Sequence, residues 1–169
     1  MSKTRYPPGM AARTFLFDLD DTLFAHRHSR EGALAAVHSA FPRLQDRDLP
    51  TVQADHDRLI DELHKDVLAG RLTIDEARLL RFRRLLERAG PACTERETKS
   101  AADRYRSAYL ASWRAVPGAI PLLASLRPHG RIAVVTNNVV SEQVEKIRIC
   151  GLEPYLDATA ISEEVGVTK

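Results

Sequence analysis

TFLFDLDDTL, residues 14–23, is the stretch that decides the fold. Its first half is an apolar run of strand length that stops at Asp18, and a second carboxylate, Asp20, follows two positions later. Three consecutive apolar residues, 15–17, predict a strand that is buried on both faces of a parallel sheet. In open α/β folds, ligands bind at the carboxyl edge of such a sheet. We therefore expect both aspartates in an acidic site there, where a cation or a shared proton offsets their repulsion.

The composition indicates one domain, or a core with a modest insert. The chain has 169 residues, 44% of them hydrophobic, and a net charge of +2 with a pI near 8.7. This charge is too balanced to indicate nucleic-acid binding. Cys93 and Cys150 have no metal-binding or redox spacing, which fits a reducing compartment. The start of the chain has no apolar signal region, and no apolar stretch approaches the roughly 20 residues of a membrane span. We expect a cytoplasmic protein with neither membrane nor nucleic acid as a partner.

Two further strands are predicted late in the sequence. The β-rich apolar run 132–135 ends at Thr136 and Asn137, and a weaker run covers about 158–161. Right-handed crossovers place the ends of all three parallel strands on one edge of the sheet. Thr136 and Asn137 should therefore converge with the two aspartates, although more than a hundred positions separate them.

A helical block separates the first strand from the other two. Apolar residues recur at helical spacing in four segments, one expected to begin at Thr51, and the short connections predict an antiparallel bundle. Residues 73–76 and 94–97 have the capping-box pattern, and Ser141 is expected to cap a later helix. The simplest arrangement is an α/β fold, with a Rossmann-like parallel sheet core of about three strands and an inserted four-helix cap. The expected parts are a flexible leader at 1–12, a discontinuous core at 13–24 plus 114–169, and a cap domain at 25–113.

The residue types at the expected sheet edge suit phosphoryl transfer. Asp18 is the candidate nucleophile, because a carboxylate that attacks phosphorus forms an aspartyl-phosphate and splits hydrolysis into two easier steps. Asp20 can protonate the leaving oxygen and then take a proton from the attacking water. Thr136 offers a hydroxyl and Lys169 a mobile cation, while Asn137 either positions the phosphate or fills a turn. Mg²⁺ suits a carboxylate site with few protein ligands.

Three segments resemble motifs of the haloacid dehalogenase (HAD) superfamily, in the right order along the chain. The first is residues 17–23, the second is residues 134–137, and the third is residues 163–169, which lead up to a lysine. Members of this superfamily with a helical cap carry it between the first and second motifs. The third segment most resembles small-molecule phosphatases, including nucleotide 5′-phosphatases. The resemblance therefore implies a hydrolase that acts on a small phosphorylated metabolite.

The resemblance also implies a role for each motif residue. Asp18 would be the nucleophile and a Mg²⁺ ligand, and Asp20 would be the acid/base, with its backbone carbonyl on Mg²⁺. Thr136 and Lys169 would hold the phosphate. Haloalkanoate dehalogenases share the fold and the cap, but they need neither Mg²⁺ nor a second acid two residues after the first. Asp20 therefore favours a Mg²⁺-dependent phosphomonoester hydrolase over a dehalogenase.

The sequence departs from the superfamily pattern at its end. The fourth motif, an acidic pair that completes the Mg²⁺ site, should lie beyond Lys169, together with strands on the other side of the first strand. Without them, the first strand would be an exposed edge that is prone to pairing. Either the sequence is a fragment of a longer phosphatase, or a partner or a second copy in a homodimer completes the sheet. We expect the chain alone to be weakly active or inactive, with a non-catalytic remnant as an alternative.

Three other features have plain interpretations beside functional ones. Asp21 suits a structural role in the loop better than a metal site. His26 and His28 alternate like metal ligands, but a solvated loop near the start of the cap explains them. The arginines at 81, 83 and 84 form a basic face that could attract an anionic substrate, although a solvated helix face accounts for most such runs.

Overall fold

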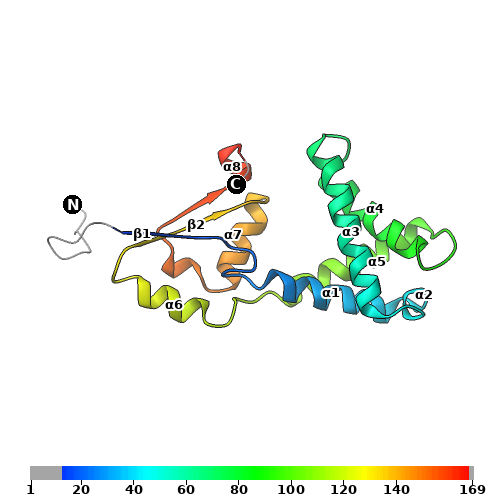
Figure 1. Ribbon diagram of the computed structural model, residues 1–169, viewed down its shortest axis with the longest axis horizontal. Helices are drawn as coiled ribbons and strands as arrows, with labels where there is room; N and C mark the ends of the chain where they lie inside the picture. Colours follow the sequence, from blue (N-terminus) through cyan, green and yellow to red (C-terminus); the bar gives the residue numbers. More distant parts are fainter. Residues whose placement is uncertain (1–12, 168–169) are drawn as a thin grey trace. The chain divides into compact units, whose positions relative to one another are not determined.

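The computed structural model describes residues 13–167 and contains a small parallel sheet (Figure 1). Its strands are β1 (Thr14–Phe17), β2 (Arg131–Thr136) and β3 (Ala158–Ile161), in the order β1-β2-β3. Phe17 lies opposite Val134, and Thr136 lies opposite Ile161. β1 ends one residue before Asp18. The prediction of an α/β fold with three parallel strands is confirmed, and the carboxyl ends of the strands share one edge.

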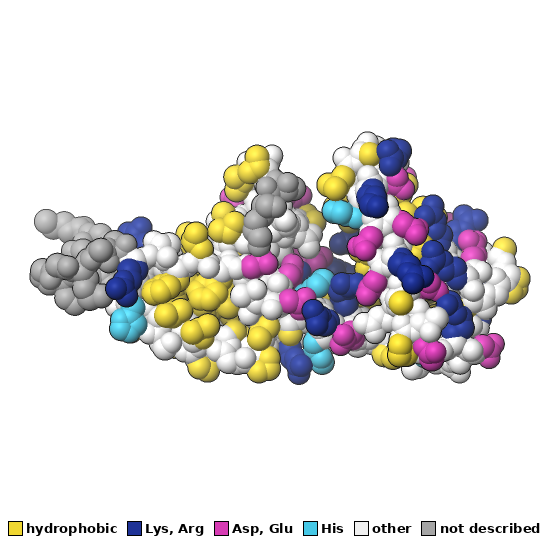
Figure 2. Space-filling view, viewed as in Figure 1, with side chains coloured by type: hydrophobic (Ala, Val, Ile, Leu, Met, Phe, Trp, Pro, Cys, Tyr) yellow, Lys and Arg dark blue, Asp and Glu magenta, His cyan; other side chains and the backbone are white. Residues whose placement is uncertain are grey.

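The prediction that residues 15–17 are buried on both faces is wrong. β1 pairs with β2 on one side and is an edge strand among the described residues. Leu16 is 67% exposed, whereas Ile132 and Val134 of the central strand β2 are fully buried. A strand buries every side chain only when it has neighbours on both sides and cover over both faces. Figure 2 shows further hydrophobic side chains gathered on the surface around α6 (Ala119–Leu126).

The loop after β1 is held by its own backbone and begins the first helix. The Leu19 carbonyl accepts hydrogen bonds from the backbone N–H groups of residues 22, 23 and 24. Asp21 has a φ of 59°, in the left-handed region that aspartate enters more readily than most residues. Its Oδ1 accepts from the Arg27 N–H at 2.7 Å, in the first turn of α1 (His26–Ala40). This contact supports the structural interpretation of Asp21. The expected loop at His26 and His28 is wrong, because α1 has already begun there.

A second helix near the sheet starts differently from the expectation. α7 (Val140–Ile149) follows β2, and its N-cap is Val139, which makes no side-chain capping bond. Ser141 lies inside the helix, so the prediction that it is the cap is wrong. Glu163 supplies an acceptor instead, since its Oε2 accepts from the Val140 N–H at 2.6 Å. Glu163 belongs to the one-turn helix α8 (Ser162–Val165). The remaining element near the sheet is the short helix η1 (Glu153–Tyr155).

The described residues divide into two compact units, 13–27 with 113–167, and 28–112. We call the second the helical unit; with most of α1 it holds α2 (Pro42–Gln45), α3 (Leu49–Leu68), α4 (Ile74–Glu87) and α5 (Glu95–Ala111). The four long helices lie where the apolar spacing predicts them, and the one-turn α2 is an addition. α4 contacts both α3 and α5 (Figure 1). Between residues 13 and 167, none of the helices is both long and apolar enough to cross a membrane.

The helix starts in this unit show which capping signals are reliable. Thr73 and Thr94 each accept a hydrogen bond from the backbone of the glutamate three residues later, and each glutamate bonds back. Both predicted capping boxes are therefore confirmed. α3 starts earlier than Thr51, because Asp48 is its N-cap and accepts from the Thr51 N–H at 2.7 Å. The aspartate is the stronger cap here, and proline at the second helical position suits a helix start.

A group of aromatic and charged side chains, which we call the Tyr105 cluster, lies among the helices of this unit; its Arg30 and Asp57 side chains are 30% and 47% exposed. Its members are Arg30, His56, Asp57, Arg81, Phe82 and Tyr105. His56 and Phe82 are 1% exposed and Tyr105 is 8% exposed. The ring centroids of His56 and Tyr105 are 5.3 Å apart. Burial, with the charges of Arg81 and Arg30, lowers the pKa of His56 from 6.5 to about 2, so the ring is neutral in the folded protein.

This buried neutral histidine should make the fold acid-sensitive. The unfolded chain binds a proton at His56 below pH 6.5 while the folded chain does not, so stability is full above pH 6.5 and falls as the pH drops. We expect the free energy of unfolding to decrease by about 2.5 kcal/mol from pH 7 to pH 4.5 through this group. Urea unfolding at several pH values measures the slope. His56→Gln should flatten it, whereas His64→Gln, at an exposed position of α3, should not. Equal slopes in all three proteins would contradict the assignment.

Candidate active site

Asp18 and Asp20 lie at the carboxyl end of β1, as predicted. The loop described above fixes their backbone, and the Asp18 Oδ1 accepts from the Leu19 N–H at 2.9 Å. Leu19 is fully buried between the two aspartates, while the aspartates themselves are partly exposed. The two carboxylates are therefore more accessible than Leu19, although that of Asp20 lies against the buried side chains of Gln143 and Lys146. Asp18 can be reached by a substrate, and its carboxylate is oriented by the neighbouring amide.

Two side chains of α7 hold the Asp20 carboxylate, one on each oxygen. Lys146 Nζ donates to Oδ1 at 2.9 Å, and Gln143 Nε2 donates to Oδ2 at 3.1 Å. His26 Nδ1 lies 3.9 Å from the same Oδ1. A carboxylate with a donor on each oxygen has a restricted orientation, and the charged donor makes the stronger bond. Asp20 is therefore a fixed group, with 27% of its side chain exposed.

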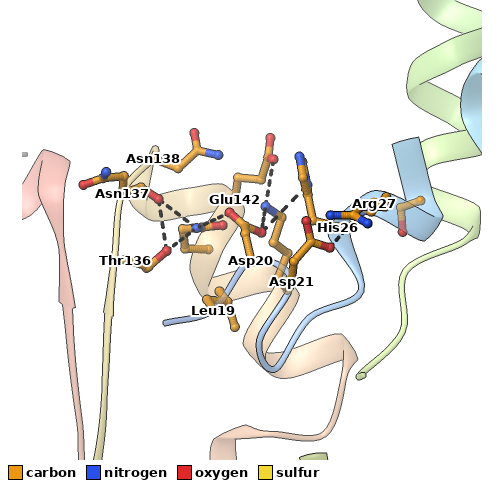
Figure 3. Close-up of polar contacts among 12 residues, drawn as sticks. Leu19, Asp20, Asp21, His26, Arg27, Thr136, Asn137, Asn138 and Glu142 are labelled. Atoms are coloured by element: carbon orange, nitrogen blue, oxygen red, sulfur yellow. Dashed lines mark hydrogen bonds and ion pairs between the residues drawn. The ribbon is translucent and has the colours of Figure 1, made fainter. Parts of the chain in front are cut away.

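Gln143 also connects Asp20 to the end of β2. Figure 3 shows Asp20 together with Thr136 and Asn137, the residues at that end. Its Nε2 donates to Thr136 Oγ1 and to the Asn137 carbonyl, both at 2.8 Å. The predicted convergence of Asp20, Thr136 and Asn137 is thus present in the structure. Thr136 is 2% exposed, and its hydroxyl donates to the Asn137 carbonyl at 3.2 Å. The hydroxyl is used internally, so phosphate binding there would replace that bond.

Lys146 is a fully buried cation with two carboxylate partners. Besides Asp20, it lies 3.4 Å from Glu142 Oε1, and its Nζ is 4.8 Å from the centre of the Phe24 ring. A buried ammonium is stable only when opposite charges and hydrogen bonds replace its water. The sequence interpretation missed both Lys146 and Gln143. The available signal was their spacing of three on the helix after Thr136, which puts both side chains on one face.

The remaining expected residues have mixed outcomes. Asn137 is exposed and directly follows β2, at the strand end where the sequence predicts it. Asn138 has a φ of 115°, its N–H donates to Ser162 Oγ at 3.1 Å, and its Oδ1 accepts from the Val139 N–H, which indicates a turn residue. Lys169, expected to bind phosphate, lies outside the described residues.

The end of β1 fits a Mg²⁺ ion that takes few protein ligands. Among residues 13–167, no group of three or more histidine, cysteine, aspartate or glutamate side chains is placed to hold a metal. Donors from α7 occupy both carboxylate oxygens of Asp20. The Asp18 carboxylate and the Asp20 backbone carbonyl are the oxygen groups at the end of β1 that would hold the metal. Mg²⁺ commonly uses one or two carboxylates, with water and phosphate oxygens completing its octahedron.

A profile of haloacid dehalogenase-like hydrolases matches residues 12–169, nearly the whole chain. The chain belongs to this family. YfnB of Bacillus subtilis is 27% identical over 160 residues, which are 93% of this chain and 64% of that protein. A crystal structure of YfnB, described as bound to magnesium, superimposes with a TM-score of 0.69 and 26% identity, covering 95% of this chain and 68% of that one.

Two further comparisons are with a phosphatase of similar sequence and with a solved structure that shares the fold. The ribulose-1,5-bisphosphate 5-phosphatase of Halopiger xanaduensis is 31% identical over 160 residues, 94% of this chain and 66% of that protein. An L-2-haloacid dehalogenase from Xanthobacter autotrophicus has a TM-score of 0.63 at 20% identity, covering 94% of this chain and 60% of that one, which shows the fold alone. The chain spans about two thirds of the length of the relatives it matches.

Proposed function

We propose that this chain carries the active site of a Mg²⁺-dependent phosphomonoester hydrolase. The substrate would be a small phosphorylated metabolite, such as a nucleotide or sugar phosphate, with the helical unit as the cap domain. The observation that carries this proposal is the fixed Asp20 carboxylate, two residues after Asp18 and joined through Gln143 to Thr136. A second acid in this place is what phosphate ester hydrolysis needs and dehalogenation does not. The relative named as a bisphosphate phosphatase supports the same chemistry.

Each reaction step has a residue suited to it. Asp18 Oδ attacks phosphorus, the bond to the ester oxygen breaks, and a protonated Asp20 gives that oxygen its proton, which leaves Asp20 as the carboxylate that Gln143 and Lys146 hold. Asp20 then takes a proton from water, which attacks the aspartyl-phosphate and releases phosphate and the free Asp18 carboxylate. Thr136 and Asn137, and in the proposal Lys169, bind phosphoryl oxygens. Asp18 and the Asp20 carbonyl would hold Mg²⁺, which supplies positive charge to the transferring group when bound.

Removing the metal tests this function directly. Phosphate release from p-nitrophenyl phosphate by the full chain should be weak but measurable at high enzyme concentration with Mg²⁺. We expect EDTA to lower it at least about tenfold, because the transferring phosphoryl charge would lose its counter-charge. Excess Mg²⁺ added back should restore it.

Two outcomes would contradict the proposal. Turnover that is unchanged by EDTA, together with chloride release from 2-chloropropionate, would indicate a dehalogenase. Absence of both activities in a folded chain would favour the non-catalytic remnant.

A further inference from the structure

We propose that the Tyr105 cluster of the helical unit binds a small oxyanion, the phosphate or carboxylate group of a ligand. Four helices supply this site, with Arg30 from α1, His56 from α3, Arg81 from α4 and Tyr105 from α5. It goes beyond the proposed hydrolysis, because that reaction assigns no role to any of these residues. Three features of the helical unit support the site: an excess of positive charge, a set of unpaired donors, and the contrast between Arg81 and the neighbouring arginines.

The first feature is an excess of positive charge in the Tyr105 cluster. Arg30 forms an ion pair with Asp57, whose Oδ1 is also 3.6 Å from His56 Nδ1. Arg81 forms no ion pair with any carboxylate among residues 13–167; its guanidinium lies 4.9 Å from the Phe82 ring centre and 5.1 Å from that of Tyr105. Burial lowers the pKa of Arg81, with Arg30 adding to the effect. The cluster therefore has two guanidinium groups and one carboxylate.

Aromatic contacts compensate this charge only in part. A cation near aromatic rings gains roughly 0.5–2 kcal/mol, whereas desolvation of an ion inside a protein costs several. Water can satisfy an N–H group but cannot neutralise a charge. An anion beside Arg81 would do both, and guanidinium groups match the planar or tetrahedral oxygens of carboxylate and phosphate.

The second feature is a set of unpaired donors in the same cluster. Arg30 Nε, His56 Nε2 and Arg81 Nε are buried and have no hydrogen-bond partner among the described residues. Buried polar atoms are nearly always satisfied in folded proteins, so three nitrogens around one tyrosine need an explanation. Each can donate, given the appropriate histidine tautomer, and Tyr105 adds a hydroxyl. A ligand that only accepts hydrogen bonds, such as an oxyanion, suits this set.

The third feature separates Arg81 from its neighbours in α4. Figure 2 shows Lys and Arg side chains interspersed with Asp and Glu over the helical unit. Arg83 follows this pattern, with 60% of its side chain exposed and its Nε 3.1 Å from Glu87 Oε1. Arg84 is 43% exposed and lies 3.8 Å from Glu62 Oε2. These two arginines are solvated and paired, so the anion site depends on Arg81 and not on a general basic face.

A phosphate titration of the full chain tests the proposal. The imidazole proton signals of His56 are followed by NMR at pH 7, with sodium chloride keeping the ionic strength constant, and are assigned by their loss in His56→Gln. We expect a saturable shift in the millimolar range. Arg81→Gln should weaken binding at least about tenfold, the usual loss for a charged hydrogen-bond partner. Arg83→Gln, the matched control in the same helix, should bind like the unchanged chain.

Further measurements identify the chemical group that binds and separate a loss of binding from a loss of folding. Tyr105→Phe, which keeps the ring, should weaken binding by less than Arg81→Gln, and it decides the matter if Arg81→Gln fails to fold. Acetate in place of phosphate shows whether the site also takes a carboxylate. The absence of a saturable His56 shift would overturn the proposal, and so would equal weakening by the Arg81 and Arg83 replacements. Phosphate that binds at the Asp18 site would instead shift the imidazole signals of His26, whose Nδ1 lies 3.9 Å from Asp20 Oδ1.

Discussion

Replacing Asp18 by asparagine should lower phosphate release by at least about 10³-fold, the scale of losing a covalent nucleophile. Asparagine has the same size, and its Oδ1 can still accept the Leu19 N–H that is 2.9 Å away in the unchanged chain. The loop should therefore keep its structure. The neutral amide, however, cannot form the aspartyl-phosphate on which the proposed reaction depends. Product release from p-nitrophenyl phosphate by the two proteins, at equal high concentration with Mg²⁺, measures the ratio.

Asp21→Asn is the matched control for this replacement. It makes the same chemical change three positions later, at a carboxylate that accepts from the Arg27 N–H. Asparagine tolerates the left-handed φ of 59° at this position, so the loop should survive. We expect turnover close to that of the unchanged chain. If Asp18→Asn retained activity, or if both variants lost it equally, the proposed nucleophile would be wrong.

The sequence was sufficient to predict where the acidic pair lies, and a sheet of three strands predicted β1 as an exposed edge, whereas the apolar run by itself predicted burial on both faces. An apolar strand that stops at a carboxylate puts that carboxylate at the carboxyl edge of a parallel sheet, so the positions of Asp18 and Asp20 could be predicted. The same run cannot reveal how many neighbours a strand has. Leu16 is 67% exposed, and β1 is an edge strand in the described residues. Sheet order depends on contacts between distant segments, which local periodicity does not encode.

The two side chains that donate to Asp20, Gln143 and Lys146, could not be predicted from local sequence patterns. Lys146 is 126 positions after Asp20, and a lysine on a helix is usually solvated. Its burial depends on the pairing of β1 with β2, which brings α7 beside the loop that follows β1. The capping boxes at Thr73 and Thr94 were predictable because both partners lie within four residues. Arg81, Arg83 and Arg84 look alike in sequence, and only packing distinguishes Arg81, which has no carboxylate partner within the part of the chain that the structure describes.

Replacing Lys146 by methionine should lower kcat by about 10²-fold with little change in KM. Lys146 contacts Asp20 and not the substrate in the proposed site, so it is a positioning residue. Methionine keeps an unbranched apolar chain against Phe24 but leaves Asp20 Oδ1 without its charged donor at 2.9 Å. General acid–base catalysis contributes roughly 10²–10⁴-fold and requires correct placement of the acid. Steady-state kinetics with p-nitrophenyl phosphate separate the two constants. Arg148→Met, on an exposed arginine of the same helix, should leave both unchanged.

A double-mutant cycle distinguishes positioning from a loss of stability. Methionine leaves the carboxylates of Asp20 and Glu142 without their buried cation, which should cost about 3 kcal/mol of folding free energy. Thermal unfolding measures that cost and sets the assay temperature at which each variant is folded. If Lys146 acts through Asp20, Lys146→Met should lower kcat no further once Asp20→Asn is present, because the group to be positioned is already lost. A full additional 10²-fold loss in the double variant would show that Lys146 acts on the reaction by another route.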